Sequence, residues 1–294
     1  MTSEEWLARQ FEENRMHLRA VAYRMLGSLA EADDAVQETW LRVTKAHTEE
    51  VDNFGGWLTT IIARICLNML RTRRSRGEQS IEAHLPDPIV SPEGQVQPED
   101  EALLADSVGL ALLVVLDTLT PAERLAFVLH DLFRLPYAEI APIVGRSPEA
   151  ARQLASRARR RVAGAELPTS DVDRHRQRRV VDAFFDAARG GDFEALLELL
   201  DEGVVLRTDF GGGRPAELIR GRAEVAEQSL SGGRLRADVH PAIVNGSAGA
   251  VITVARRPFA VMGFVIRDGL IVEIDAIADS VRVGRVAASV LDRI

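Results

Sequence analysis

The sequence predicts two all-α domains, the second with a helix-turn-helix, followed by an α+β domain. Apolar residues recur at helical spacing from Trp6 to about Arg74 and again from Glu101 onward, which predicts the helical domains. Runs of β-branched residues bounded by glycine or proline begin near Val204, and helices followed by an antiparallel meander are typical of an α+β domain. The 294 residues leave room for more than one domain of about 100–200 residues. The predicted segments are a first domain at 1–76, a linker at 77–100, a second domain at 101–165 and a third at 174–294.

The composition favours a globular protein without disulfide bonds or structural metal ions. Hydrophobic residues make up 46% of the chain, and no apolar run approaches the roughly 18 residues that a membrane helix needs. The single cysteine, Cys66, excludes an internal disulfide and fits a reducing compartment. The first residues are acidic where a secretory signal would be basic, so we expect a cytoplasmic protein. We expect no membrane partner, no cofactor and no metal.

One predicted helix in the first domain is strongly two-sided. The segment from Glu31 to Val43 places apolar residues on one side and acidic or amide residues on the other. The apolar side consists of Ala35, Val36, Thr39, Trp40 and Val43. The exposed side consists of Asp33, Asp34, Gln37 and Glu38. The sequence therefore predicts an acidic helix face on the surface of the first domain.

The charge is strongly segregated along the chain, although its sum is −8. Residues 57–77 hold five arginines and no acid, whereas residues 78–101 hold seven acids and no basic residue. The distribution matters more than the sum for a nucleic-acid binder, so the basic helix remains a candidate DNA-binding element. Its arginines also suit the negative end of a helix dipole, which is the alternative. The acidic segment holds four of the twelve prolines, so we expect an extended linker, either a solvated spacer or a segment that follows a basic channel.

Residues 135–162 have the spacing of a helix-turn-helix. The first helix places apolar residues inward, Gly145 permits the turn, and Ser147 with Pro148 begins the second helix. Arginine and glutamine side chains carry paired donors that match base edges, and other arginines neutralise phosphates. The alternative is an ordinary α-hairpin with a solvated basic face. The second helix presents Arg152, Gln153, Ser156, Arg157 and Arg160.

The third domain begins with two predicted helices between Arg174 and about Leu200, separated at 190–192. Strands then follow, with Asn245-Gly246 and Asp268-Gly269 as hairpin turns. The predicted strands are 204–208, 235–244, 250–254, 259–266 and 270–276.

These motifs carry a family resemblance. The segments DDAVQETWLRV and FGGWLTTIIARICLNMLRTRRSR, followed by the helix-turn-helix, resemble the two domains of extracytoplasmic-function sigma factors of bacterial RNA polymerase. Either motif alone is modestly specific, whereas the two in this order are highly specific. The resemblance implies an alternative sigma factor that binds RNA polymerase core and directs initiation at specific promoters.

The last 120 residues or so resemble a SnoaL-like domain, a cone-shaped α+β fold that one group of these sigma factors carries as an extension. In that group the extension acts on the sigma domains of the same chain. Three segments correspond to the motifs of the group: His84-Leu85-Pro86-Asp87-Pro88, Asp209 to Arg214, and Ala278-Asp279-Ser280. The match departs from the group's pattern, because a histidine replaces the tryptophan of the linker motif and Phe210 is inserted in the glycine loop.

The resemblance and the charge pattern together give four sets of candidate residues. The polymerase-binding set is Asp33, Asp34, Gln37, Glu38 and Arg42. The set for the downstream promoter element is Arg64, Asn68, Arg71, Arg73 and Arg74, with Trp57 or Phe54 as stacking candidates. The set for the upstream element is Ser147, Arg152, Gln153, Ser156, Arg157 and Arg160. The interdomain and regulatory set is Leu85, Pro86, Asp209, Gly211, Gly212, Gly213 and Arg214.

Two other classes of function stay open at this point. The third domain is an enzyme or a ligand sensor if its fold encloses an apolar cavity, with Asp209, His240 and Asp275 as the acid-base candidates. The chain is instead an operator-binding regulator with a ligand-sensing domain if the helix-turn-helix alone contacts DNA. That second alternative leaves residues 1–75 without a role. A small ligand of the third domain therefore remains open as a partner.

Overall fold

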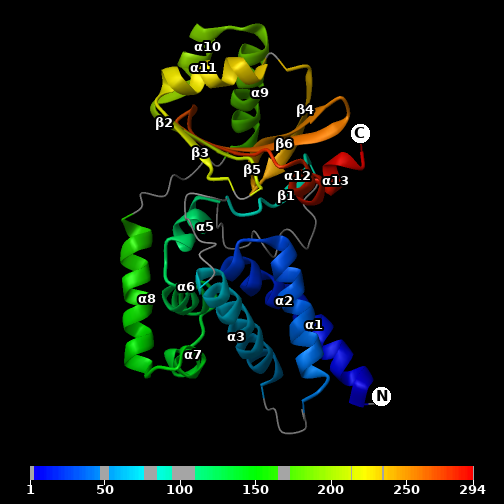
Figure 1. Ribbon diagram of the computed structural model, residues 1–294, viewed down its shortest axis with the longest axis vertical. Helices are drawn as coiled ribbons and strands as arrows, with labels where there is room; N and C mark the ends of the chain where they lie inside the picture. Colours follow the sequence, from blue (N-terminus) through cyan, green and yellow to red (C-terminus); the bar gives the residue numbers. More distant parts are fainter. Residues whose placement is uncertain are drawn as a thin grey trace. The chain divides into compact units, whose positions relative to one another are not determined.

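The computed structural model describes residues 3–46, 53–75, 85–94, 110–164, 173–212, 214–233 and 235–293 (Figure 1). The chain divides into two compact units. The described residues of the helical unit lie within 3–75 and 112–164, and those of the α+β unit lie within 85–94, 110–111 and 173–293. Among the described helices none is long and apolar enough to cross a membrane. Of the candidate residues, Gly213 lies outside the described part, as does His84 of the linker motif.

The helical unit begins with α1 (Ser3–Leu26), α2 (Leu29–Val43) and α3 (Phe54–Ser75). Gly27 ends α1 with a positive φ of 72°, and the Ser28 side chain caps α2 by accepting a hydrogen bond from the Glu31 amide. The expected apolar side of α2 is largely buried, since Ala35, Val36, Thr39 and Val43 are at most 4% exposed. These helices therefore form where the periodicity predicts, and α1 packs against both of the others.

The second part of the helical unit contains the predicted helix-turn-helix. Thr120 and Glu123 form a capping box, in which each side chain accepts a hydrogen bond from the other residue's amide. Gly145 ends α7 at φ 70°, and Ser147 caps α8 with Pro148 at its first position. The elements are α5 (Leu110–Asp117), α6 (Pro121–Phe127), a π-helical turn (Val128–Leu132), α7 (Tyr137–Val144) and α8 (Pro148–Ala163).

The two halves of the helical unit contact each other through buried polar side chains. The Arg124 Nε on α6 donates to the Arg24 carbonyl on α1 at 3.1 Å, and both side chains are at most 2% exposed. The Phe133 ring lies 5.2 Å from the Arg24 guanidinium and 5.2 Å from the His17 ring. The sequence predicts separate domains at 1–76 and 101–165, whereas their described residues share one compact unit here. Contacts of this kind join residues about 100 positions apart and leave no local pattern in the sequence.

The α+β unit has a seven-stranded sheet in the order β1-β4-β5-β6-β7-β2-β3. Strands β4 to β7 form the expected antiparallel meander, and β2 pairs with β7 in parallel. The strands are β1 (Val90–Pro92), β2 (Leu200–Asp209), β3 (Glu217–Arg220), β4 (Ala237–Val244), β5 (Ser247–Val254), β6 (Arg257–Arg267) and β7 (Leu270–Ile277). The helices are α9 (Arg174–Gly190), α10 (Phe193–Leu199), α11 (Arg222–Gly233), α12 (Ser280–Val286) and α13 (Ala288–Leu291).

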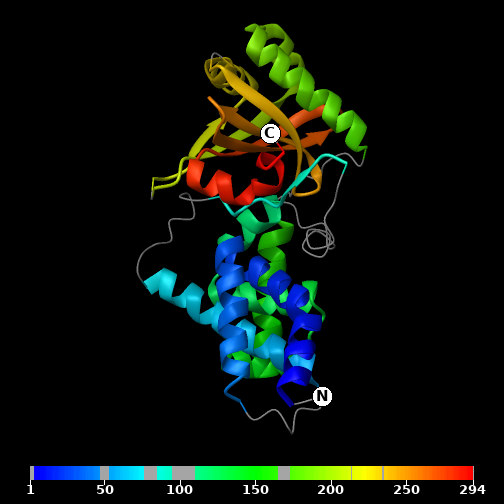
Figure 2. The same cartoon turned by 90° about the vertical axis from the view of Figure 1, so that its right-hand side faces the viewer.

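Helices cover both faces of this sheet. Figures 1 and 2 show α9, α10 and α11 on one face and α12 with α13 on the other. The first face carries a core that includes Phe184, Leu196, Leu206, Phe264 and Ile274. Three helices, α11, α12 and α13, and the short strand β3 have no counterpart among the elements that the periodicity predicts. They are short or lack a strong apolar period, so packing against the sheet stabilises them more than their local sequence does.

Part of the expected linker is a strand of the α+β unit. Val90 to Pro92 pair antiparallel with Val244 to Ala242 of β4, and every residue from 85 to 92 is buried. The Ile89 amide donates to the Asn245 Oδ1 at 2.9 Å, and the Asn245 amide donates to the Ile89 carbonyl. The expected linker at 77–100 thus contains a strand at 90–92, while the buried residues 85–89 have no regular secondary structure. An edge strand tolerates proline, so the prolines mislead the sequence reading here.

Candidate functional site

An exposed arginine face runs along α3. Arg64, Asn68 and Arg71 lie at i, i+4 and i+7 on one side of the helix, and Arg74 borders them. All four side chains are exposed, and none has a hydrogen-bond or ion-pair partner among the described residues. Unpaired guanidinium groups on one helix face are suited to phosphates, and an exposed amide has the donors and acceptors to contact a base. We call Arg64, Asn68, Arg71 and Arg74 the α3 face.

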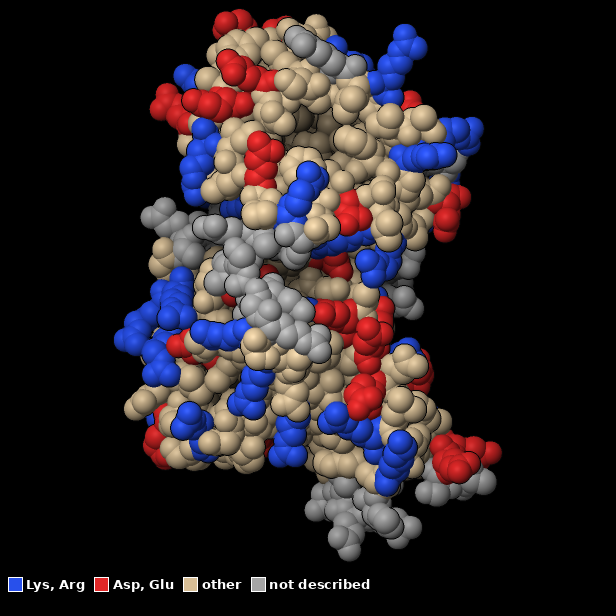
Figure 3. All heavy atoms as spheres, viewed as in Figure 1, with Lys and Arg blue, Asp and Glu red and all other residues tan. Residues whose placement is uncertain are grey.

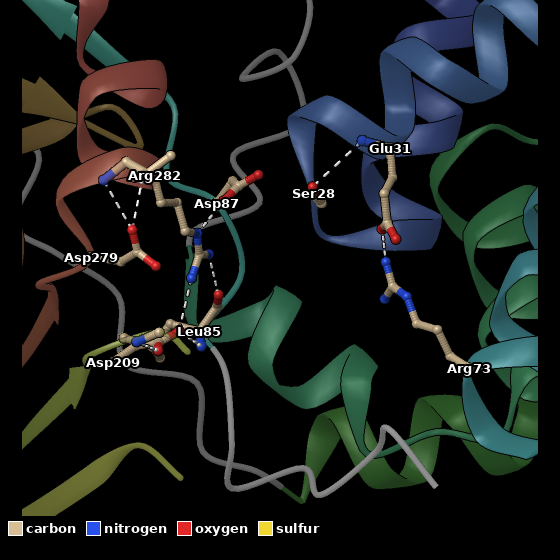
Figure 4. A network of polar contacts seen from close by, with 10 residues as sticks. Ser28, Glu31, Arg73, Leu85, Asp87, Asp209, Asp279 and Arg282 are labelled. Carbon is tan, nitrogen blue, oxygen red and sulfur yellow. Dashed lines mark hydrogen bonds and ion pairs between the residues drawn. The ribbon is translucent and has the colours of Figure 1, made fainter. Parts of the chain in front are cut away.

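Arg73 differs from its neighbours, because it points away from the α3 face. Its guanidinium forms an ion pair with Glu31 of α2 and donates to the Leu26 carbonyl at 3.2 Å (Figure 4). Residues two positions apart on a helix do not share a face, so Arg71 and Arg73 project in different directions. Its contacts hold α3 to the turn between α1 and α2. Arg73 therefore has a structural role that its place in the basic run does not reveal.

The aromatic stacking candidates of α3 also have packing partners. Phe54 is 7% exposed, and its ring lies 5.3 Å from the Trp6 ring and 5.6 Å from the Trp57 ring. Trp57 is partly exposed at the border of this aromatic group. Phe54 thus packs in the interior, and Trp57 is the one of the two with surface available for stacking.

A second exposed face lies on α8, where arginine side chains gather in Figure 3. Arg152, Ser156 and Arg160 lie at i, i+4 and i+8, and Gln153 lies beside them. Gln153 and Arg160 are exposed and have no side-chain partner among the described residues. The Arg152 guanidinium lies 5.5 Å from the centre of the Tyr137 ring, which holds it near the start of α8. We call Arg152, Gln153, Ser156 and Arg160 the α8 face.

The neighbouring arginines of α8 are engaged within the protein. The Arg157 Nε lies 3.0 Å from Glu123 Oε1, and an Arg161 nitrogen lies 3.0 Å from Glu123 Oε2. Burial alone would raise the pKa of Glu123, but hydrogen bonds from Thr120 and the two arginines bring that pKa below its ordinary value. The Glu123 carboxylate therefore joins the start of α6 to α8. Arg157 is therefore part of this contact between α6 and α8. Ser147, a further candidate for DNA contact, serves as the cap of α8.

The acidic face predicted on α2 is exposed, and Figure 3 shows acidic side chains gathered there. The Asp33 carboxylate lies 2.6 Å from the Arg19 Nε, and Glu38 pairs with Arg42 one turn later at 2.8 Å. Asp34 and Gln37 are exposed, with no partner for their side chains in the part of the chain that the structure describes. The same face includes Leu41, which is 47% exposed and which the sequence reading passed over.

The regulatory candidates come together around an arginine of α12. The Arg282 guanidinium donates to the Asp209 carboxylate at 2.7 Å, to the Asp87 carboxylate and to the Leu85 carbonyl (Figure 4). The Leu85 amide donates in turn to the Asp209 carboxylate at 2.8 Å. Asp209 is 0% exposed and Asp87 is 3% exposed, so the positive charge of this arginine offsets part of the cost of burying both carboxylates. We call Leu85, Asp87, Asp209 and Arg282 the Arg282 cluster.

The glycine loop after β2 is shaped around the same cluster. The Gly211 amide donates to Asp209 at 2.8 Å, and Gly211 has a φ of 65°. A Cβ at Gly211 would lie 2.0 Å from the Asp279 carboxylate, so only glycine fits. Asp279 caps α12 and so orients Arg282. Gly212 also has a positive φ, and the Arg214 guanidinium lies 5.2 Å from the Phe210 ring.

The acid-base candidates of the α+β unit do not share a site. Asp209 belongs to the Arg282 cluster, and the His240 Nε2 lies 2.9 Å from the Thr253 hydroxyl. Arg207 binds Asp275 and Glu273, each at 2.7 Å, on the strand side opposite the apolar cavity that α9, α11 and the sheet line. Burial and the Glu273 carboxylate raise the pKa of Asp275 to about 7, against the opposing effect of Arg207.

Arg282 and Asp87 are the site residues that the sequence reading missed. Asp87 stands in an acidic, proline-rich segment, and Arg282 stands in a short helix without a strong period. A partial signal exists for Arg282, because it comes three residues after Asp279 in the last of the three motifs. Its partners lie 73 and 195 residues away in the chain, which spacing cannot show.

Comparison with known families matches both parts of the helical unit. The family model for Sigma-70 region 2 matches residues 10–76, and the model for Sigma-70, region 4 matches residues 109–162. The α3 face lies within the first match, and the α8 face lies within the second.

Two relatives from Mycobacterium tuberculosis are similar over most of the chain. The protein named probable ECF RNA polymerase sigma factor SigI is 38% identical over 212 residues, which cover 71% of this chain and 72% of the relative. The ECF RNA polymerase sigma factor SigJ is 37% identical over 248 residues, which cover 82% and 79% of the two chains.

The crystal structure of SigJ from Mycobacterium tuberculosis is also similar in fold. It matches with a TM-score of 0.73 and 31% identity over 94% of this chain and 97% of that chain. The match spans the helical unit and the α+β unit. The predicted fold class, helical sigma domains followed by an α+β domain, is therefore confirmed.

Proposed function

Because this chain belongs to the extracytoplasmic-function (ECF) family of RNA polymerase sigma factors, we propose that its exposed helix faces bind polymerase core and two promoter elements. One observation carries the assignment of sites. In the two segments that match Sigma-70 regions 2 and 4, α3 and α8 each expose basic and amide side chains that no described acid neutralises. The chain directs initiation at specific promoters and acts in the cytoplasm, where the polymerase works.

The α3 face engages the downstream element. Strand separation exposes phosphates and unstacked bases, and Arg64, Arg71 and Arg74 provide the positive charge that follows a single strand. Asn68 lies between Arg64 and Arg71, where its amide contacts an unstacked base. Arg73 supports this helix from behind through Glu31 and does not touch DNA.

The α8 face reads the upstream element in duplex form. Arg152, Gln153 and Arg160 contact base edges in the major groove, and Ser156 lies among them. Arg157 contributes indirectly, because its contact with Glu123 holds α8 against α6. A phosphate contact and a base contact are separable, since only the second changes sequence preference.

The exposed face of α2 binds the polymerase core. Asp34 and Gln37 supply exposed polar groups, and Leu41 supplies an apolar contact one turn further along. The pairs Asp33–Arg19 and Glu38–Arg42 fix the charges around them. An apolar residue ringed by polar ones is the usual arrangement at the centre of a protein interface.

The α+β domain modulates the sigma domains of the same chain through the linker. The Arg282 cluster holds residues 85–92, and those residues lie between the segments matched by regions 2 and 4. The length of linker that remains outside the α+β unit therefore depends on whether the cluster is intact. This contact is the physical means by which the domain acts on the rest of the chain.

Run-off transcription with polymerase core and the full chain tests the sigma assignment. We expect initiation that depends on both core and this chain, and a loss of more than tenfold when Arg71 and Arg74 are both replaced by alanine, since one lost contact of about 1.4 kcal/mol already amounts to tenfold. Arg267→Ala, which removes an exposed arginine of β6, is the matched control and should leave initiation unchanged. Tight duplex binding without core, and no initiation with it, would instead identify an operator-binding regulator.

The same assay tests modulation in cis. Arg282→Met removes the donor that holds the linker, and we expect the rate of initiation to change while core binding persists. Arg285→Met, an exposed position on the same helix, is the control. Equal rates for the two variants and the unaltered protein would contradict a role for the cluster.

A further inference from the structure

The α+β unit contains an apolar cavity that the sigma assignment does not use. Its volume is about 370 Å³, within the range of about 300–1,000 Å³ that small-molecule sites occupy. Figure 3 shows a hollow among uncharged residues of this unit. Three large apolar side chains at the cavity wall, Phe210, Leu235 and Phe259, are 36–45% exposed. They are three of the six large hydrophobic residues that are exposed in the described chain, and grouping of this kind marks a binding surface.

The chemistry of the wall favours binding over catalysis. Among the described residues that line the cavity there is no aspartate, glutamate or histidine, and the uncharged polar side chains are Thr208, Gln228, Ser229 and Ser231. Proton transfer needs a titratable group within hydrogen-bond reach of the substrate, and Asp209, His240 and Asp275 are absent from the lining. The wall thus offers apolar area and a few hydroxyl and amide groups.

One charged side chain stands at the border of the cavity. Arg189 of α9 lines it and also lines an adjoining open hollow with Asp238, His240 and Arg256. His240 is engaged with Thr253. Arg189 lies 3.7 Å from Asp186, but both side chains are more than half exposed, so this pair leaves the guanidinium accessible. An apolar hollow with an accessible guanidinium at its border matches a ligand with an apolar body and an anionic end.

The cavity wall and the Arg282 cluster are opposite sides of the same strand end. Thr208 and Phe210 line the cavity, whereas Asp209 between them points into the cluster. Just after the end of the neighbouring strand β7, Ala278 lines the cavity. Its amide donates to the Asp209 carbonyl at 2.7 Å, and Asp279 follows it. Side chains alternate between the two faces of a strand, so a molecule against Phe210 bears directly on the backbone that positions Asp209.

We propose that this cavity binds a small apolar carboxylate, with its apolar body against Phe210 and Met262 and its carboxylate at Arg189, and that binding alters the hold of Asp209 on Leu85. The binding itself is independent of the proposed function. The effect on the linker rests on the proposed role of the Arg282 cluster. Occupancy of the cavity thereby becomes a signal that reaches the segment between the two sigma domains.

Calorimetric titration of the full chain with three probes tests the ligand class. Decanoate, decanol and decyltrimethylammonium share an apolar chain and differ in charge. We expect decanoate to bind most tightly and the cation most weakly. The positive charge of Arg189 should make their dissociation constants differ by roughly fivefold or more. Arg189→Glu should reverse the order of decanoate and the cation and leave decanol unchanged. Equal affinities for all three probes would overturn the anionic end of the proposal.

A second variant tests the location. Ala260→Phe places a large side chain in the cavity wall and should abolish binding of all three probes, with circular dichroism and thermal unfolding as the check of folding. Glu194→Phe, a change of similar size at an exposed position of α10, is the control. The charge ranking in the unaltered protein does not depend on this variant. Failure of all three probes to bind the unaltered protein would overturn the site.

Amide hydrogen exchange tests the link to the linker. We expect decanoate to change the exchange rate of the Leu85 amide, which donates to Asp209, and to leave the helical amides of α8 unchanged. In Asp209→Asn the Leu85 amide should respond less to decanoate, although decanoate still binds. Binding of decanoate with unchanged exchange at Leu85 would refute the link. Absence of core-dependent initiation in a protein that still binds decanoate would count against the proposed function alone.

Discussion

The arginines of the α3 and α8 faces and the arginine of the Arg282 cluster use the same side chain in opposite ways. Arg71 and Arg160 are exposed and have no partner among the described residues. Arg282 is only 15% exposed in its side chain and donates to two carboxylates and a carbonyl. The exposed guanidinium groups keep their donors for a molecule outside the chain. The buried one has its donors satisfied by segments that are far apart in sequence.

This comparison shows that the role of an arginine depends on the acceptors built around it. Arg71 and Arg73 are two positions apart in one basic run, yet only Arg73 has an acceptor, Glu31, on a neighbouring helix. Arg157 and Arg160 differ in the same way, because Glu123 lies beside Arg157 alone of the two. A basic cluster in the sequence therefore contains both exposed arginines and arginines with structural partners.

The largest expected effect is at the Arg282 cluster. Arg282→Met removes the guanidinium that pairs with the buried carboxylates of Asp87 and Asp209, and we expect the α+β unit to lose about 3 kcal/mol of stability. Amide exchange of β2 and β7 measures this, because all tryptophans and tyrosines lie in the helical unit and fluorescence would not report it. Arg285→Met should be neutral. A loss below about 0.5 kcal/mol, the range of ordinary surface substitutions, would place Arg282 with the exposed arginines.

The next effect is on promoter binding by α8. Arg160→Ala should weaken binding of the holoenzyme to promoter DNA by about 1–3 kcal/mol and relax preference at one base pair. Arg157→Ala should weaken binding less and lower the stability of the helical unit by about 1 kcal/mol, through loss of the Glu123 contact. Binding affinities on a set of single-base promoter variants separate the two. A larger effect of Arg157 on sequence preference would reverse this assignment.

The pair Arg71 and Arg73 sharpens the comparison within one helix. Arg71→Ala should reduce the slope of log affinity against log salt by about 1 and leave stability unchanged. Arg73→Ala should leave the slope unchanged and destabilise the helical unit by about 1 kcal/mol, since it breaks a half-buried contact to Glu31. Salt titrations of promoter binding and tryptophan-detected unfolding measure the two quantities. An equal reduction of the slope in the two variants would mean that both arginines touch phosphate.

The last prediction concerns pH. The pKa of Asp275 is raised from 3.8 to about 7, first by burial and then by Glu273, so the folded α+β unit holds a proton that the unfolded chain releases between these values. The contribution of this group to stability therefore falls as pH rises through that window. Asp275→Asn should flatten this dependence while keeping the bond from Arg207, as thermal unfolding across the window would show. An unchanged pH profile in the variant would assign the dependence to other groups.

The sequence by itself determined the order of the parts and most of their elements. Helix periods, the Thr120 and Ser147 caps, the Gly145 turn and the two hairpin signals depend on residues within a few positions of one another, so they can be predicted along the chain. The order of the two sigma motifs is likewise a property of the chain.

The tertiary structure alone decided which polar residues are available and where the linker lies. Leu85 meets Asp209 across 124 residues, and Arg282 meets Leu85 across 197. The prolines of the linker favoured an irregular spacer. Instead, pairing with β4 and the ion pair of Asp87 with Arg282 hold residues 85–92 in the α+β unit. Sequence patterns such as helix periods and caps depend only on residues a few positions apart. The free energy that fixes a buried charge comes from acceptors and donors that only the folded chain brings together.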